Sequence, residues 1–214
     1  MRSVLFEWAR WGFQRIPAWL FRWRPFTVYE IQLEMAKQCD VESNEDVAVR
    51  WASREDQSKC SSLSPPHLFE RLGIGYAALV AERDDEAVGI VWLATPSFVE
   101  SELGVSFEYL ASDVWLFAAH VLPKHRKTGV YSQLLLRAID EYSANGFHRI
   151  LFATTLGNVA SQHAHEKFGA QSLGAITAAR IGSWLSLARC SGEVDRLSAG
   201  LVFGRDGIVR FRIR

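Results

Sequence analysis

The hydrophobic pattern of the chain follows two periods, and each period predicts one kind of element. Short runs rich in β-branched and aromatic residues, either alternating or continuously apolar, predict strands. A polar turn at residues 83–86 joins two of these runs into a hairpin. The predicted strands are residues 26–33, 76–82, 87–93, 114–122 and 149–155, and the segment 171–188 contains the last two strands of the domain.

Two segments have helical spacing instead. In residues 130–142 the apolar side chains recur every three to four positions, and Asn145-Gly146 is a helix-ending pair. Residues 158–168 form a second predicted helix, which Gly169 closes. Asn158 suits its N-cap because an asparagine side chain accepts hydrogen bonds from first-turn amides.

The remaining segments are less regular. We expect residues 34–60 to be helical in parts, Pro66 to open a short helix through residue 72, and residues 96–109 to form a long loop. Two apolar runs at 201–203 and 208–213 flank a Gly-Arg-Asp-Gly turn and predict a terminal hairpin.

Residues 1–24 form a predicted amphipathic arm with a local charge of +4 and half of the tryptophans. Tryptophans gather on one helical face and arginines on the other, and Pro17 divides the segment into two short helices. This composition is typical of helices that lie in a membrane interface, but it equally suits docking on the domain or on a second subunit. These alternatives remain open.

Size and composition indicate one α/β (α+β) domain, residues 25–214, behind that arm. The formal net charge is zero, so nothing points to nucleic acid. Three widely spaced cysteines and the lack of a signal-peptide pattern favour free thiols in the cytoplasm. No spacing supports a metal site at Cys190, His163 and His165. No apolar run reaches the roughly 18 residues of a membrane-spanning helix.

The strand at 114–122 passes through a short basic turn directly into the helix at 130–142. Pro123 ends the strand, since proline cannot donate to a sheet ladder. Such a turn presents unpaired backbone amides at the positive end of a helix dipole, where Arg126 and Lys127 add charge. The segment therefore predicts an anion site, most naturally for a phosphate or diphosphate.

Two motifs stand in the segments around the basic turn and the second helix. The first motif is Val121-x-Pro123-x-x-Arg126-x-x-Gly129-Val130-Tyr131, and the second is Asn158-x-x-Ser161-x-x-x-His165-Glu166-Lys167-Phe168-Gly169. These motifs and the order of the elements resemble the GNAT superfamily of N-acetyltransferases. Two departures stand out: Tyr131 replaces the usual glycine or alanine, and His165 replaces a tyrosine that in the family protonates the coenzyme A thiolate.

The resemblance implies a mixed, mostly antiparallel central sheet of about seven strands flanked by helices, which opens between its fourth and fifth strands to admit acyl-coenzyme A. Backbone groups of the fourth strand would hold the pantetheine arm, the basic turn would hold the diphosphate, and the second helix would contact the arm from the other side. The implied cofactor-binding residues are His120, Val121, Leu122, Arg126, Lys127, Thr128, Gly129, Val130, Tyr131, Asn158 and Ser161.

The expected catalytic residues are His165 and Glu108. His165 could protonate the departing thiolate, although a solvated histidine is the competing interpretation. Glu108 lies on the predicted loop, from which it could reach inward as the general base. The other candidates are Glu100, Glu102, His120 and a water chain; strand alternation places His120 on the face opposite Asp113.

The resemblance thus implies an N-acyltransferase that moves an acetyl or longer acyl group from acyl-coenzyme A to a primary amine by direct attack in a ternary complex. No metal is expected. The acceptor would be an unidentified small molecule or a membrane-borne glycan precursor, the latter matching a peripheral membrane arm. The alternative is a catalytically degenerate GNAT fold that acts as an acyl-coenzyme A sensor or interaction module.

Overall fold

The structure, a computed structural model, describes residues 20–36, 46–204 and 207–213. The chain divides into two compact units. The second unit comprises Val28–Ser97 and Leu110–Ser172, and the first unit comprises Met1–Thr27, Phe98–Tyr109 and Leu173–Arg214. The predicted arm lies mostly outside the described residues, so its membrane or subunit contact stays a prediction.

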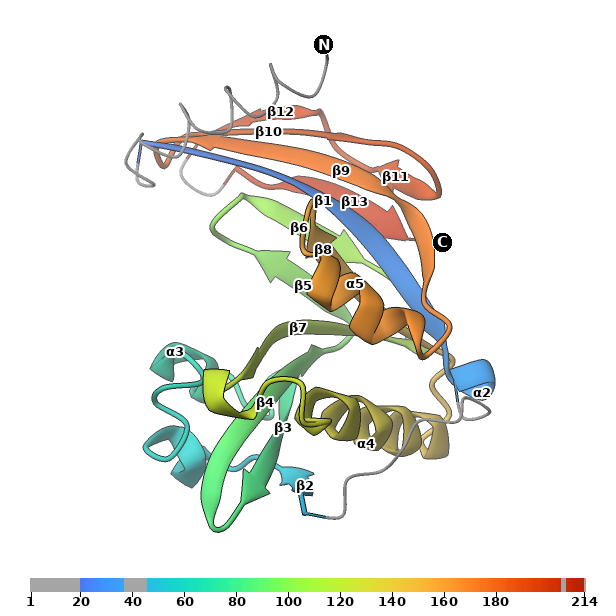
Figure 1. The fold of residues 1–214 in the computed structure, drawn as a ribbon. Helices are drawn as coiled ribbons and strands as arrows, with labels where there is room; N and C mark the ends of the chain where they lie inside the picture. The colour runs from blue at the N-terminus through green and yellow to red at the C-terminus, as the bar shows by residue number, and fades with distance from the viewer. Residues whose placement is uncertain (1–19, 37–45, 205–206, 214) are drawn as a thin grey trace. The chain divides into compact units, whose positions relative to one another are not determined.

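The second unit is built on a mixed sheet with the strand order β1-β8-β7-β4-β3-β2 (Figure 1). The pairs β2–β3, β3–β4 and β4–β7 are antiparallel, whereas β7 and β8 are parallel. This confirms the predicted mixed, mostly antiparallel sheet. The strands are β1 (Phe21–Gln32), β2 (Ala48–Trp51), β3 (Tyr76–Arg83), β4 (Glu86–Ala94), β7 (Asp113–Val121) and β8 (Arg149–Thr155).

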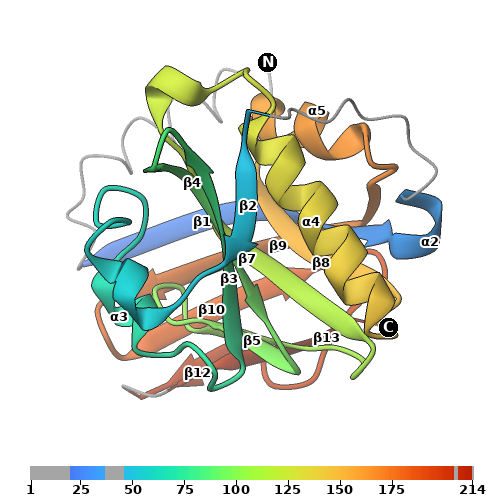
Figure 2. The ribbon, with the colours of Figure 1, turned by 90° about the horizontal axis from the view of Figure 1, so that it is seen from below.

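The long helix α4 (Val130–Ala144) supplies one side of the core of this unit. Its buried face, with Leu134 and Leu135 at its centre, packs in one hydrophobic cluster with Val91 of β4 and Phe152 of β8. Figure 2 shows α4 along one face of these strands. The other helices are α2 (Leu33–Ala36), η1 (Arg54–Gln57), α3 (Pro66–Phe69), η2 (Pro123–His125) and α5 (Val159–Glu166).

The first unit is dominated by strands. One group has the order β12-β10-β9-β1, and a second sheet has the order β11-β13-β6-β5. Phe107 lies at the centre of the second sheet and packs against the rings of Phe26, Phe98 and Phe211. The strands are β5 (Ser97–Glu100), β6 (Val105–Glu108), β9 (Gln171–Ile181), β10 (Leu185–Cys190), β11 (Val194–Arg196), β12 (Leu201–Phe203) and β13 (Val209–Ile213).

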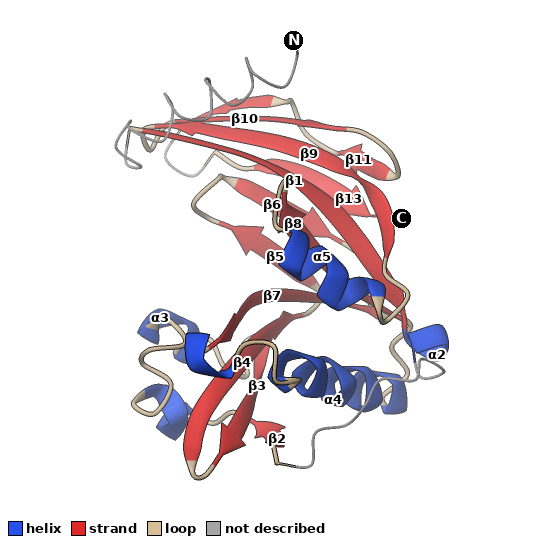
Figure 3. Cartoon of the chain, in the orientation of Figure 1, coloured by secondary structure: helices blue, strands red, loops and turns tan. Residues whose placement is uncertain are grey.

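Three sequence predictions are wrong in this structure. Residues 96–109 contain the short strands β5 and β6, which Figure 3 draws as arrows. The terminal runs do not form a hairpin, because β12 pairs with β10 whereas β13 pairs with β6 and β11. Residues 21–24 belong to β1, so the predicted helical arm does not extend through them. The prediction that residues 34–60 are helical in parts is confirmed by α2 and η1, and the strand β2 lies between them.

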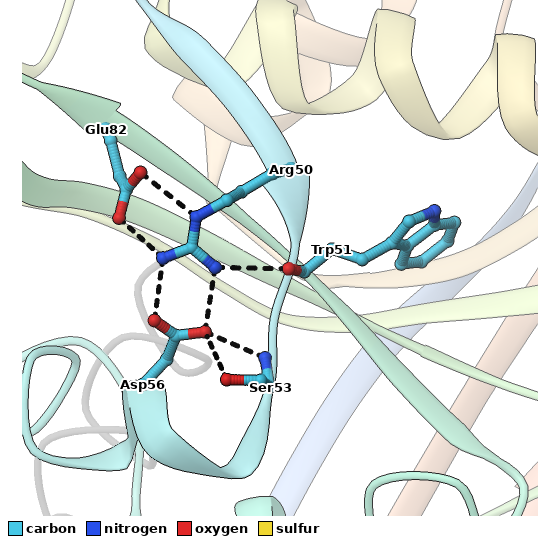
Figure 4. Close-up of polar contacts among 5 residues, drawn as sticks. All are labelled: Arg50, Trp51, Ser53, Asp56 and Glu82. Carbon is cyan, nitrogen blue, oxygen red and sulfur yellow. Dashed lines mark hydrogen bonds and ion pairs between the residues drawn. The ribbon is translucent and has the colours of Figure 1, made fainter.

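Strand β2 is held by Arg50, whose guanidinium joins two carboxylates (Figure 4). It donates to Asp56 at 2.7 and 2.8 Å and to Glu82 at 2.6 and 3.1 Å. Ser53 also donates to Asp56, through its amide at 2.7 Å. These bonds hold the pKa of Asp56 well below its usual range, with the Arg50 bond as the main cause. The network fastens β2 and η1 to β3.

Within the described residues, no helix is long and apolar enough to cross a membrane. Cys60 and Cys190 are free thiols. The same part of the chain contains no group of three or more His, Cys, Asp and Glu side chains that could hold a metal ion.

Candidate functional site: a bulged strand, a basic turn and a helix N-terminus

Strand β7 contains a β-bulge shortly before its end. Phe117 pairs with Trp92 and His120 pairs with Ile90, so two residues of β7 oppose one residue of β4. Ala118, inside the bulge, has a φ of 45°. Because Trp92 and Ile90 point to the same face of β4, the bulge brings His120 to the face of Phe117. The predicted placement of His120 on the opposite face is therefore wrong.

The same bulge lies where β7 and β8 cease to pair. The last pair of their parallel ladder is Leu116 with Phe152, although β7 continues to Val121 and β8 to Thr155. Ala118 and Ala119, just past the last pair, are exposed. The structure thus gives β7 an edge beyond Leu116 that makes no further pairs with β8 in the described part of the chain.

Only some backbone groups at this edge remain available to a ligand. The amide of Leu122 already donates to the carbonyl of Val88 at 2.9 Å, and its carbonyl accepts from the amide of His125 at 2.8 Å. Leu122 is therefore a poor candidate for holding a cofactor arm through its N–H. Of the three strand residues predicted for this role, His120 and Val121 lie within β7 itself and Leu122 follows it.

The turn after β7 is shaped by two residues with left-handed backbones. Lys127 has a φ of 65° and Gly129, the N-cap of α4, has a φ of 82°. A glycine suits the second position because it adopts this conformation without strain. Gly89 of β4 lies under the start of α4, where a Cβ would meet Val130 Cγ1 at 2.9 Å. The small residue lets the helix begin close against the sheet.

The N-terminus of α4 has no side-chain cap. The first amides of an α-helix have no acceptor within the helix, so those of Val130 and Tyr131 point beyond it. Together with the helix dipole they form a site that favours an anion. The turn therefore fits the diphosphate of a nucleotide cofactor.

The basic side chains of the turn have different surroundings. Arg126 is exposed and donates through Nε to the carbonyl of Val121 at 3.2 Å, which fixes it beside the strand end. Lys124 is paired with Glu86 at 2.7 Å, whereas Lys127 is exposed on the turn. The hydroxyl of Thr128 donates to the carbonyl of His125 at 2.8 Å and so stabilises the turn itself. Arg126 and Lys127 are the cations best suited to a bound phosphate.

Helix α5 begins as the sequence predicts. The side-chain oxygen of Asn158 accepts from the amide of Ser161 at 3.2 Å, which confirms Asn158 as the N-cap. This bond uses the side-chain oxygen of Asn158 and not its NH₂ group. The predicted contact of Asn158 and Ser161 with a cofactor arm stays a prediction.

His165 is buried, with an exposed fraction of 4%, so its interpretation as a solvated residue is wrong. Its Nδ1 lies 2.6 Å from the carbonyl oxygen of Ser161, and its Nε2 lies 2.6 Å from the hydroxyl of Tyr131. A carbonyl only accepts, so Nδ1 carries the proton and Nε2 accepts from Tyr131. The ring also stacks on Phe152 with a centroid separation of 3.8 Å.

Burial sets the protonation of this pair. It lowers the pKa of His165 to about 4, against the smaller opposing effect of the Ser161 carbonyl. Burial also raises the pKa of Tyr131. At neutral pH the pair is therefore an uncharged imidazole and an un-ionised phenol. The single acidic hydrogen between them belongs to the Tyr131 hydroxyl.

The two departures from the GNAT motifs are thus in contact with each other. Sequence reasoning considered Tyr131 and His165 separately and missed the bond between them. Their residue types gave the only signal, because a phenol and an imidazole on neighbouring helices can pair. A single sequence does not show which way either side chain points.

The three glutamates predicted as bases belong to the first unit, and two of them lie close to arginines. Glu108 belongs to β6 of the first unit, is half-exposed, and lies 3.4 Å from Arg212. Burial raises the pKa of Glu100. Glu102 lies near Arg22 and Arg24 at 3.8 and 3.9 Å. Asp113, which is not one of the predicted bases, is fully buried and bound by Arg149 of β8 at 2.6 and 3.0 Å. The base assigned to Glu108 stays a prediction.

Comparison with known proteins agrees with this geometry. Residues 45–170 match the model of the acetyltransferase (GNAT) family. Among solved structures, a Drosophila protein superposes with a TM-score of 0.57 at 15% identity, covering 81% of this chain and 56% of its own. A GNAT-family acetyltransferase from Novosphingobium aromaticivorans, described as putative, gives 0.52 at 13% identity, covering 74% and 63%.

A GNAT-family acetyltransferase from Colwellia psychrerythraea gives a TM-score of 0.51 at 14% identity, covering 73% of this chain and 55% of its own. The chain thus spans between 55% and 63% of the length of these three solved proteins. No curated protein matches the sequence. The family match covers more than half of the chain and includes the bulged strand, the basic turn and both site helices. The chain belongs to the GNAT acetyltransferase family.

Proposed function

We propose that this protein is an N-acyltransferase that moves an acetyl or other acyl group from acyl-coenzyme A to a primary amine. The observation that carries the proposal is the uncapped N-terminus of α4, which directly follows the strand where the β7–β8 ladder ends. Amides at a helix start bind phosphate oxygens, and an unpaired strand edge binds an extended amide chain. Coenzyme A carries both groups in one molecule.

In this proposal the diphosphate binds the amides of Val130 and Tyr131, with Arg126 and Lys127 beside it. The pantetheine arm then runs along β7 beyond Leu116, where the amide of Val121 faces away from β4 and supplies a backbone donor. Asn158 contributes its side-chain NH₂ from the N-cap of α5. These residues bind and orient the thioester, and orientation lowers the barrier for direct attack by an amine.

The bond between Tyr131 and His165 supports one proposal for the proton that the thiolate takes up. In this proposal the Tyr131 hydroxyl, which donates to Nε2 of the neutral His165 at 2.6 Å, turns from His165 to the departing thiolate and protonates it. The tyrosinate that remains takes up a proton from solvent and returns to its bond with His165. For the amine we retain Glu108 as the predicted base. His120 is the second candidate, because the bulge moves it to the face of Phe117.

A sensor or interaction module is the competing function. It is favoured by one observation: both ring nitrogens of His165 are hydrogen-bonded and the ring is neutral, so His165 itself is a poor proton donor for a thiolate. Such a protein would bind acyl-coenzyme A without turning it over.

Thiol release distinguishes the two functions. Acetyl-coenzyme A is incubated with amino sugars, amino acids, polyamines and peptide N-termini, and free thiol is followed optically. If the protein is an enzyme, it releases thiol with at least one amine well above the rate without acceptor. The Tyr131→Phe variant then has a lower kcat with a smaller change in KM. A protein that binds acetyl-coenzyme A but releases no thiol with any acceptor is a sensor.

A further inference from the structure

Thr154 of β8 carries a buried hydroxyl that the mechanism above does not use. The residue is 3% exposed, and its Oγ1 has no hydrogen-bond partner among the described residues. Buried hydroxyl groups in folded proteins nearly always have a partner, so an unpaired one needs an explanation. A group bound at this place would supply the missing partner.

The hydroxyl faces the side of the sheet on which α4 and α5 lie. Side chains two residues apart share a face of a strand, so Thr154 points to the same face as Phe152. Phe152 packs in the α4 cluster and stacks on His165 of α5. Thr155 is exposed and points to the opposite face. Thr154 therefore belongs to the face that also carries Tyr131 and His165.

Along the strand, Thr154 lies just beyond the end of the ladder. The parallel register pairs Leu116 with Phe152, so continuing it places Thr154 level with Ala118. Ala118 is the bulged residue with a φ of 45°. The unpaired hydroxyl thus lies where β7 and β8 no longer bond to each other.

The polar groups on the same face do not serve this hydroxyl. His165 accepts from Tyr131 through Nε2 and donates to Ser161 through Nδ1, which uses both ring nitrogens. Tyr131 donates its only hydroxyl hydrogen to that bond, and its oxygen accepts no hydrogen bond from Thr154. Neither side chain therefore explains why a threonine is buried at position 154.

We infer that the Thr154 hydroxyl binds the pantetheine arm of acyl-coenzyme A by a hydrogen bond to one of its amide groups. This rests on the proposed function. The arm carries two secondary amides, each with an acceptor oxygen and a donor N–H, and a hydroxyl bonds to either. Thr154 is thus a cofactor-binding residue on β8, across from the edge of β7 that holds the same arm.

The test compares Thr154→Val, Thr154→Ser and Thr155→Val with the wild-type protein. Valine has the shape of threonine without the hydroxyl, and Thr155 is the matched control on the exposed face. Titration calorimetry measures the affinity for coenzyme A and for 3′-phosphoadenosine 5′-diphosphate, which lacks pantetheine. Thermal unfolding without ligand measures the stability of each variant.

We expect Thr154→Val to weaken coenzyme A binding roughly 3- to 10-fold, the effect of one hydrogen bond, and to leave 3′-phosphoadenosine 5′-diphosphate binding unchanged. Its Tm should stay equal to that of the wild-type protein or rise, because valine removes an unpaired buried hydroxyl. Thr154→Ser and Thr155→Val should bind coenzyme A like the wild-type protein.

Three results would overturn the inference. Coenzyme A binding by Thr154→Val at wild-type strength would show that the hydroxyl makes no bond to the arm. A clearly lowered Tm would show that the hydroxyl is bonded within the protein. Failure of the wild-type protein to bind either nucleotide would remove the proposed function as well, and that outcome is distinct from a defect confined to Thr154→Val.

Discussion

At the scale of single residues, the bond between Tyr131 and His165 decides the charge inside the second unit. Each side chain satisfies the polar atom of the other, and the Ser161 carbonyl fixes which nitrogen of the imidazole carries the proton. Protonating His165 would place a charge in a buried site and would put two hydrogens into the bond to Tyr131. The folded state therefore resists the charging of this histidine.

This resistance predicts a dependence of stability on pH. The pKa of His165 is about 4 in the folded protein, against about 6.5 for an unperturbed histidine. The stability that the neutral ring contributes is fully present above pH 6.5 and is lost as the pH falls toward 4, because the unfolded chain takes up the proton first. The loss between pH 7 and pH 5 should be about 2 kcal/mol.

Urea unfolding at pH 7 and pH 5 measures this loss. His165→Phe keeps a ring against Phe152 but cannot titrate, so its free energy of unfolding should fall about 2 kcal/mol less than that of the wild-type protein. The exposed His163 on the same helix gives the control His163→Gln, which should follow the wild-type protein. Equal losses in the wild-type protein and His165→Phe would contradict the account.

The structural role of a residue could be predicted from the sequence where the residue belongs to a motif. The cap of α5 by Asn158 follows from local chemistry, because an asparagine side chain accepts hydrogen bonds from first-turn amides. The orientation of Tyr131 and the burial of His165 and Thr154 depend on how helices and strands pack across the unit. A single sequence carries no record of that packing.

At the scale of elements, Arg149 of β8 ties three strands of the second unit together. It bonds to Asp113 of β7 at 2.6 and 3.0 Å and to Glu30 of β1 at 2.8 Å. All three side chains are largely buried. These bonds raise the pKa of Arg149, with the Asp113 bond as the main cause. The charge of the arginine is what allows two carboxylates to lie inside the protein.

Removing that charge should be costly. Arg149→Met leaves Asp113 and Glu30 buried without a counter-ion, so the free energy of unfolding should fall by about 3–5 kcal/mol. Urea unfolding at pH 7 measures it. The matched control Arg137→Met removes a half-exposed arginine paired with Glu141 on α4, and its change should stay within about 0.5 kcal/mol. Similar small changes in both variants would contradict a structural role for this triad.

Long periodic elements could be predicted closely, and short ones could not. The hairpin of β3 and β4, the strand β8 and the helix α4 have enough residues for their period to be visible. Strands β5 and β6 have four residues each, which is too short for a visible period, and β6 also pairs with the distant strand β13. The bulge in β7 moves His120 to the other face of the strand, and no residue type in this part of the sequence predicts a bulge.

At the scale of the molecule, the family and its central sheet could be predicted because two motifs occur in the right order. The division into two units could not, because the first unit gathers three separate segments of the chain. Its strands have no motif, and the polar alternation in 97–108 was too short to separate from a loop. The acceptor could not be predicted either, because no motif in the sequence identifies the residues that would bind it.

The central claim is that the start of α4 binds the diphosphate of acyl-coenzyme A, and titration calorimetry with acetyl-coenzyme A tests it most directly. We predict saturable binding that Lys127→Glu weakens at least tenfold, because it places a negative charge beside the phosphates, whereas Lys167→Glu at the exposed end of α5 leaves binding unchanged. Absence of binding at millimolar ligand, or equal binding by both charge-reversal variants, would contradict the account.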